Sequence, residues 1–275
     1  MIINHNLNAM NAHRMMGINI NNAAKSMEKL SSGLRINRAG DDAAGLSISE
    51  KMRAQIRGLD QASRNSQDGI SLIQTAEGSL NETQSILQRM RELSVQAAND
   101  TNVTVDRSAI QDELTSLTTE VDRIANTTTF NEKNLLDGKL SGTDGAKLQI
   151  GANSSADLTM TVKIGNMAAS ALGITGIAVS THSAAANAVT LVNSAIKTVS
   201  TQRSQLGAYQ NRLEHTVANL DNASENLQSA ESRVRDVDMA SEMMNYTKNN
   251  ILQQAAQAML AQANQAPQGV LELLR

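Results

Sequence analysis

The stretch VNSAIKTVSTQRSQLGAYQNRLEHTVANLDNASENLQSAESRV, residues 192–234, has an apolar residue at every seventh position. These positions are Val192, Val199, Leu206, Leu213, Leu220, Leu227 and Val234. A repeat of seven places a narrow apolar stripe along one side of a helix, and such a stripe needs a partner helix to cover it. The stretch therefore predicts one long helix that packs against another.

A second stripe in the same chain can supply the partner. Met52, Leu59, Ile73, Leu80 and Leu87 follow one heptad frame, which is interrupted only at Ser66. We expect a long helix from Ala43 to about Asn99 that packs on the first one. The predicted seam consists of Leu59, Ile73, Leu80, Leu87, Leu206, Leu213, Leu220, Leu227 and Val234.

The composition favours long helices over a compact core. The chain has 275 residues and is 40% hydrophobic, but it contains one Phe, two Tyr and no Trp beside 13 Met. Ala, Leu and Met are strong helix formers. We therefore expect a mainly α fold in which long antiparallel helices form a coiled-coil-like bundle with a small β-hairpin region.

Further helices are predicted at both ends and in the middle. Residues 7–34 and the residues beyond Val237 form weakly amphipathic, Asn-rich stretches that we expect to pack together. Residues 31–42 interrupt the first stretch, and Asp41 or Asp42 is a suitable N-cap for the next helix. Residues 106–125 carry a clean stripe at spacings of three and four.

The middle of the chain has a different pattern. Apolar and polar residues alternate near residues 147–164 across a Gly-Ala-Asn-Ser-Ser turn region, which predicts a β-hairpin. The Ala- and Gly-rich residues that follow, 165–187, read as a short, variable connection. We expect the long heptad helix to begin near Ala188.

The same sequence argues against several classes of function. A net charge of −3, and arginines such as Arg53 and Arg57 without interleaved aromatic residues, do not suit nucleic-acid binding. No run approaches the roughly 20 apolar residues that span a bilayer, so we expect no membrane insertion. The N-terminal residues lack the pattern of a cleavable secretory signal.

Catalytic chemistry is equally unsupported. The chain has no Cys, and His5, His13, His182 and His215 are isolated from one another with no Glu following them. No glycine-rich phosphate loop and no Ser-His-Asp arrangement is apparent. We therefore expect no catalytic residue, no metal and no cofactor, and predict that the protein is not an enzyme.

Several long runs closely resemble bacterial flagellin. At the N-terminal end they are KLSSGLRINRAGDDAAGLSISEKMR (residues 29–53), NSQDGISLIQTAEGSL (65–80) and LQRMRELSVQAAND (87–100). At the C-terminal end they are SQLGAYQNRLEHTVANL (204–220), AESRVRDVDMASEM (230–243) and NNILQQAAQAMLAQANQAPQGVLELLR (249–275). The resemblance covers roughly residues 1–165 and 188–275, as in a short flagellin without large variable outer domains.

The resemblance implies a structural subunit that polymerises into the extracellular filament of the bacterial flagellum, for swimming motility. Residues 1–42 and 236–275 would form an inner coiled-coil domain that becomes ordered on polymerisation, and residues 43–235 an outer core domain. Inner-domain polymerisation would involve Leu7, Leu30, Leu34, Ile251, Leu252, Met259, Leu260, Leu271 and Leu274.

The family also implies partners. They are other copies of the chain, a flagellar export chaperone, the filament cap protein, hook–filament junction proteins and the Toll-like innate immune receptor for flagellin. Family members leave the cell unfolded through the flagellar type III export system. The matching receptor-contact positions are Gln88, Arg89, Leu93 and Glu113. The alternative is a hook–filament junction protein or another secreted coiled-coil binding protein.

Overall fold

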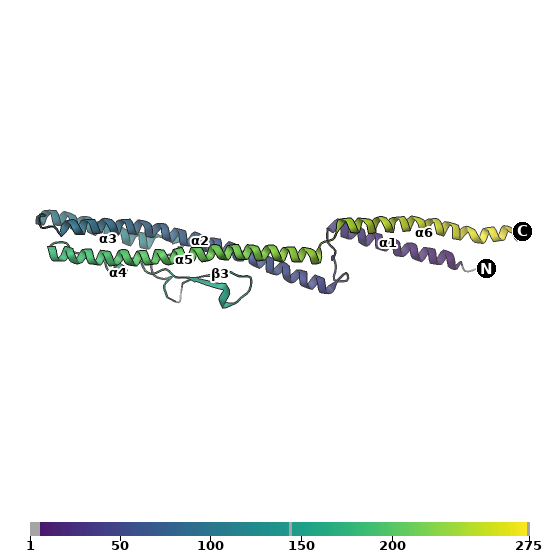
Figure 1. Cartoon of the computed structure of the whole chain (residues 1–275), viewed down its shortest axis with the longest axis horizontal. Helices are drawn as coiled ribbons and strands as arrows, with labels where there is room; N and C mark the ends of the chain where they lie inside the picture. Colours follow the sequence, from purple (N-terminus) through teal and green to yellow (C-terminus); the bar gives the residue numbers. More distant parts are fainter. Residues whose placement is uncertain (1–5, 143–144, 274–275) are drawn as a thin grey trace. The chain divides into compact units, whose positions relative to one another are not determined.

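The protein is mainly helical, as predicted (Figure 1). The computed structural model describes residues 6–142 and 145–273, with side chains up to Gln265. The long helices are α1 (Leu7–Ser32), α2 (Ala43–Ala97), α3 (Thr104–Thr127), α5 (His182–Arg235) and α6 (Met239–Leu273). Between α3 and α5 lie β1 (Thr129–Phe130), β2 (Lys133–Asn134), β3 (Ala146–Gln149), the 3₁₀ helix η1 (Ala156–Leu158), β4 (Thr159–Val162) and the short helix α4 (Ala169–Leu172).

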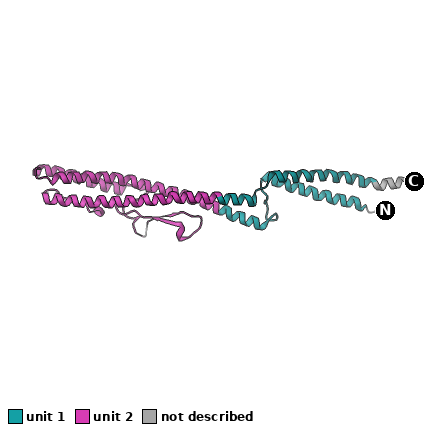
Figure 2. Cartoon of the chain, in the orientation of Figure 1, with its two compact units in different colours: residues 1–54, 226–275 teal, residues 55–225 magenta. Residues whose placement is uncertain are grey.

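The chain divides into two compact units (Figure 2). One contains residues 1–54 and 226–275, and the other contains residues 55–225. Each unit thus joins segments that are far apart in the sequence. Within the described part of the chain, no helix combines the length and the apolar character that crossing a bilayer demands.

The predicted packing of α2 on α5 is confirmed and forms the core of the unit 55–225. The helices run antiparallel, because Ser63 donates a hydrogen bond to Asp221 at 3.0 Å whereas Arg203 donates to Gln84 at 2.6 Å. The helix α3 adds a third apolar face. Fully or almost fully buried residues of the core include Ile73, Leu80, Leu87, Ile110, Leu114, Val121, Val192, Val199, Leu206 and Leu213.

The burial of the predicted seam is graded along its length. Leu220 is still buried. Leu59, Leu227 and Val234 are only half-buried. Where the burial of the seam decreases, polar contacts join the two helices. Ser224 donates to Asp60 at 2.9 Å within the unit 55–225. Ion pairs follow in the other unit, where Arg53 lies 3.4 Å from Glu231 and Arg235 lies 2.9 Å from Glu50. Apolar packing is therefore strongest toward the α3 end of α2 and weakest near the terminal helices.

The break in the α2 stripe has a structural purpose. Ser66 is fully buried, and its hydroxyl donates to the carbonyl of Ala62 at 2.8 Å, so the polar group is satisfied within the helix. Small residues near it leave room for the β3–β4 hairpin: a Cβ added to Gly69 would lie 2.4 Å from a methyl carbon of Leu148. The side chain of Asn65 also donates to Gln149 O at 3.2 Å.

The predicted hairpin near 147–164 is confirmed by the antiparallel pair β3–β4, with Leu148 opposite Met160. A second hairpin, β1–β2, was not predicted. Its turn residues Asn131 and Glu132 both have positive φ, 48° and 64°, which is the backbone of a two-residue type I′ turn. The sequence there indicates a turn, but its flanking strands of two residues are too short to show alternation.

The segment after β4 is packed tightly rather than forming a loose excursion. Its apolar side chains are buried at regular intervals, namely Ile164, Met167, Ala169, Leu172, Ile174, Ile177 and Val179. The long helix α5 begins at His182, earlier than predicted. Thr181 explains the earlier start, because its hydroxyl accepts from Ala184 N and its carbonyl accepts from Ala185 N.

Two glutamine side chains hold this segment against α3 and α5. Each amide acts as a strand would, donating through Nε2 to one carbonyl and accepting through Oε1 from a nearby backbone N–H. Backbone groups of the segment thereby form hydrogen bonds although the segment belongs to no β-sheet. The bonds are Gln202 to Lys163 O and from Gly165 N, both 3.1 Å, and Gln111 to Ile177 O at 2.7 Å and from Val179 N at 2.9 Å.

The connector between α1 and α2 uses both predicted acidic residues. Gly33, with φ of 73°, ends α1 in the left-handed conformation. Asp42 accepts from Gly45 N at 2.8 Å and so caps α2. Asp41 instead accepts from Arg38 N and Asn37 N. These backbone donors lower the pKa of the Asp41 carboxyl, and the Arg38 N–H has the larger effect.

Two glycines of α2 provide a matched test of hairpin docking. Replacing Gly78, which has open space around it, by Ala should raise the free energy of unfolding by about 0.5–1 kcal/mol through helix propensity. At Gly58 the added Cβ would lie 2.8 Å from Ala152 Cβ. Gly58→Ala should therefore lower the free energy of unfolding by about 1–3 kcal/mol, because the site becomes overpacked. Urea unfolding followed by circular dichroism measures both; equal effects would contradict this packing.

Candidate functional site

The two terminal helices pack together, as predicted, but mostly through small and polar side chains. The helices run antiparallel, because Asn6 Nδ2 donates to Ala263 O at 2.7 Å and Val237 N donates to Gly33 O at 3.1 Å. The less exposed residues recur at spacings of three and four, which marks a heptad seam. On α1 they are Ala9, Ala12, Met16, Asn19, Ala23, Ser26 and Leu30, and on α6 they are Glu242, Tyr246, Asn249, Gln253, Ala256, Leu260 and Ala263.

Most of the large apolar residues of these helices lie on the outside of the pair. Leu7 is 67% exposed and Met244 is 68% exposed. We call the whole set the outer apolar face: Leu7, Met10, Met15, Ile18, Ile20 and Met27 of α1, with Met239, Met243, Met244, Ile251, Leu252 and Met259 of α6. Apolar side chains gathered in this number on two adjacent helices are typical of a surface that another protein covers.

The predicted polymerisation residues fall into three groups. Leu7, Ile251, Leu252 and Met259 belong to the outer apolar face. Leu30, Leu34 and Leu260 are half-buried, and Leu34 also pairs with Asp236 in an isolated β-bridge. The side chain of Leu271 and the whole of Leu274 lie outside the described residues. Of the seven outer methionines, the sequence predicted only Met259 as a polymerisation residue, although the helical spacing of the other six and the lack of a nearby core were visible.

The residues predicted to contact the immune receptor do not share one environment. Gln88, Arg89 and Glu113 are exposed, whereas Leu93 is only 2% exposed and packs in the core. The spacing of four residues led us to expect that Leu93 shares a face with Arg89. The structure turns Leu93 inward toward the core beneath that surface, so it can contact a partner only if the helices separate.

Arg89 joins α2 to α3 on this surface. Its Nε and Nη2 atoms both donate to Glu113 Oε1 at 3.0 Å, and its Nη1 atom lies 3.4 Å from Glu92 Oε2. These carboxylates raise the pKa of the Arg89 guanidinium, with Glu113 as the larger influence. The result is a fixed, charged patch formed by side chains of two helices.

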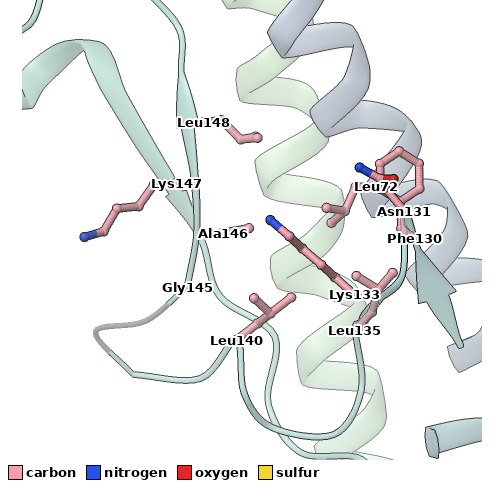
Figure 3. Close-up of a pocket in the computed structure, with 10 residues that line it drawn as sticks. All are labelled: Leu72, Phe130, Asn131, Lys133, Leu135, Leu140, Gly145, Ala146, Lys147 and Leu148. Carbon is pink, nitrogen blue, oxygen red and sulfur yellow. The ribbon is translucent and has the colours of Figure 1, made fainter.

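The described residues offer little support for catalysis. No group of three or more His, Cys, Asp or Glu among them could hold a metal ion. A hollow of about 500 Å³ lies between α2, the β1–β2 hairpin and β3, and its described lining is mostly apolar (Figure 3). Of these lining residues, only Lys133 and Lys147 are ionisable, and neither is near a nucleophile or a carboxylate among them.

Comparison with known proteins agrees with this surface-based reading. Residues 3–141 match the family model of the bacterial flagellin N-terminal helical region, and residues 189–274 match that of the bacterial flagellin C-terminal helical region. A flagellin of Halalkalibacterium halodurans is 63% identical over 100% of both chains, and a flagellin of Bacillus subtilis is 55% identical over 100% of both.

A solved flagellar hook-associated protein of Vibrio parahaemolyticus is similar in fold, with a TM-score of 0.59 at 14% identity over 71% of this chain and 100% of that chain. At this identity the likeness concerns the fold alone. Matches to both flagellin models and to full-length relatives lead to a definite assignment: the chain belongs to the bacterial flagellin family, whose members are structural, non-enzymatic subunits of the extracellular flagellar filament.

Proposed function

We propose that this chain polymerises into the flagellar filament through the outer apolar face of α1 and α6. The observation that carries the proposal is the inverted arrangement of these helices: mostly small and polar residues form the intramolecular seam, while most of the large apolar residues are exposed. Burying one Ile, Leu or Met side chain is worth about 1.5–3 kcal/mol, so covering the face with neighbouring subunits is strongly favourable.

The same arrangement predicts conditional order at the chain ends. A two-helix pair whose seam is mostly small and polar, with only Met16, Leu30, Tyr246 and Leu260 as larger apolar or aromatic residues, buries little apolar surface, and isolated helices of low propensity are marginal in water. We propose that residues 1–42 and 236–275 form the inner domain, which is stabilised on polymerisation, and that residues 43–235 form the outer core domain. The buried seam of α2 and α5 supports stability of the latter before assembly.

Export as an unfolded chain is consistent with the composition. The chain has no Cys and a single Pro, so no disulfide can form and few peptide bonds isomerise slowly. We propose passage through the flagellar type III system, with an export chaperone, the filament cap protein and hook–filament junction proteins as partners. A junction protein or another secreted coiled-coil binding protein remains the alternative, and it would not grow into long filaments.

A second proposed role is as a ligand of the Toll-like receptor for flagellin. The patch formed by Gln88, Arg89 and Glu113 supports this role, because its side chains are exposed and ordered by the Arg89–Glu113 pair. A receptor carboxylate or carbonyl could accept from the remaining guanidinium N–H groups. Neighbouring subunits in a filament could cover the same patch. We therefore expect the receptor to recognise the monomer.

Elongation of seeds tests the assembly surface. Ile251→Asn should leave the packed core of the unit 55–225 unchanged, because Ile251 is 60% exposed and belongs to the other unit, but should raise the critical concentration for growth at least tenfold. Gln254→Asn, a polar change at an exposed position of the same helix, is the control. Sedimentation and negative-stain microscopy give the readout. Normal growth of Ile251→Asn argues against this surface, and failure of the unaltered chain to grow favours the junction-protein alternative.

Receptor signalling by monomer tests the charged patch. Arg89→Ala removes charge-assisted hydrogen bonds and should weaken signalling about tenfold or more. The matched control is Arg123→Ala, because Arg123 is also exposed and paired with an acid of its own helix, Glu120. A reporter cell line that expresses the receptor measures both variants. Equal potency of the two would remove Arg89 from the contact.

A further inference from the structure

Exposed valines gather where α2 turns into α3. Among the described residues of the unit 55–225, four large apolar side chains are exposed, and three of them lie within residues 95–105. Val105 is 77% exposed, Val103 is 61% exposed and Val95 is 55% exposed. We call these three residues the valine knob. The fourth, Leu191, lies apart from them in the sequence, on α5.

Side-chain hydrogen bonds and an ion pair hold the turn beside the knob. Asp106 accepts from Val103 N at 3.2 Å and caps α3. Arg107 donates to Ala97 O at 3.2 Å and pairs with Asp100 at 3.1 Å. Asp100 is paired with Arg107, whereas Asp106 uses one carboxylate oxygen for the cap and forms no ion pair with a described residue, so it leaves a negative charge beside Val105. The knob is therefore a fixed apolar projection with one negative charge beside it.

The hollow in the same unit has the complementary character. Leu72, Phe130, Leu135, Leu140 and Leu148 form apolar walls, and Lys133 extends between Ala146 and Leu72 (Figure 3). Lys133 takes part in none of the ion pairs between described residues, and a lysine beside an apolar hollow suits an acid next to an apolar side chain. The hollow thus offers an apolar site with one positive charge beside it.

We propose that the valine knob of one copy of the chain inserts into this hollow of a second copy, with Asp106 facing Lys133. The proposal rests on the polymerisation proposed above and specifies one contact of the polymer. Knob and hollow are different surfaces of one unit, and at about 1.5 Å rise per residue Leu72 and the end of α2 at Ala97 are roughly 37 Å apart. A contact between two different surfaces is heterologous, and repetition of it produces an open polymer rather than a closed dimer.

Cross-linking between copies tests the contact directly, because the chain has no cysteine of its own. Val105→Cys and Ala146→Cys are prepared as separate variants, co-polymerised on seeds and treated with a short bis-maleimide. We expect covalent dimers from the mixed filament and none above background from dilute mixed monomer. Ser116→Cys, at an exposed position of α3, replaces Val105→Cys as the matched control and should give no dimer.

The outcomes separate this inference from the polymerisation on which it rests. If filaments grow and Val105→Cys cross-links no more than Ser116→Cys, the knob does not enter the hollow and the inference is overturned. If the unaltered chain forms no filament, polymerisation itself fails. Cross-linking of Ala146→Cys to another site, such as a cysteine placed at Met244, would also overturn it, because a different segment then fills the hollow.

Charge reversal supplies a second, independent measurement. Lys133→Glu should raise the critical concentration for growth about tenfold, and Lys133→Glu combined with Asp106→Lys should recover at least part of that loss. Lys197→Glu, a reversal at an exposed lysine of α5, is the control and should have no effect. Loss of growth in Lys133→Glu without recovery in the double variant would contradict the pairing of Lys133 with Asp106.

Discussion

The antiparallel contact between α2 and α5 is the interaction on which the rest of the structure depends. One apolar residue in seven on α5 meets the matching positions of α2, and the resulting seam buries Leu80, Leu87 and Leu206 completely. Because aromatic residues are nearly absent, little else in the composition could hold the chain together. This pair of helices supports the other elements of the unit, namely α3, both hairpins and the segment after β4, which pack against it. A two-stranded hairpin would not be stable alone.

The sequence predicted those features that follow from regular repetition. The long helices, the α2–α5 and α1–α6 packing and the β3–β4 hairpin were all readable, because each has a period that can be counted. Leu93 shows a feature that periodicity does not decide. A spacing of four residues groups Leu93 with Arg89, yet Leu93 is buried in the core whereas Arg89 is exposed and pairs with Glu113 of α3, and only tertiary contacts distinguish the two positions.

Other features escaped prediction because their signal is not periodic. The β1–β2 hairpin depends on two residues with positive φ, and neither of them is Gly. The segment after β4 depends on amide side chains of Gln111 and Gln202, which are distant in the sequence from the backbone they hold. In the terminal helices, apolar residues were expected to take part in polymerisation, and the residues of the seam between α1 and α6 were not predicted. That seam consists mostly of small and polar residues, which the hydrophobic pattern does not reveal.

The outer apolar face is also unusual in kind, because most of its exposed side chains are methionines. Met10, Met15, Met27, Met239, Met243, Met244 and Met259 carry unbranched thioether chains with three rotatable bonds. Such chains fill irregular gaps and adjust to partners of somewhat different shape, whereas the branched side chains of Ile and Val adopt fewer rotamers and adjust less. A surface of this kind tolerates small displacements: neighbouring molecules can shift slightly while their methionine contacts readjust, which would make a long fibre mechanically compliant.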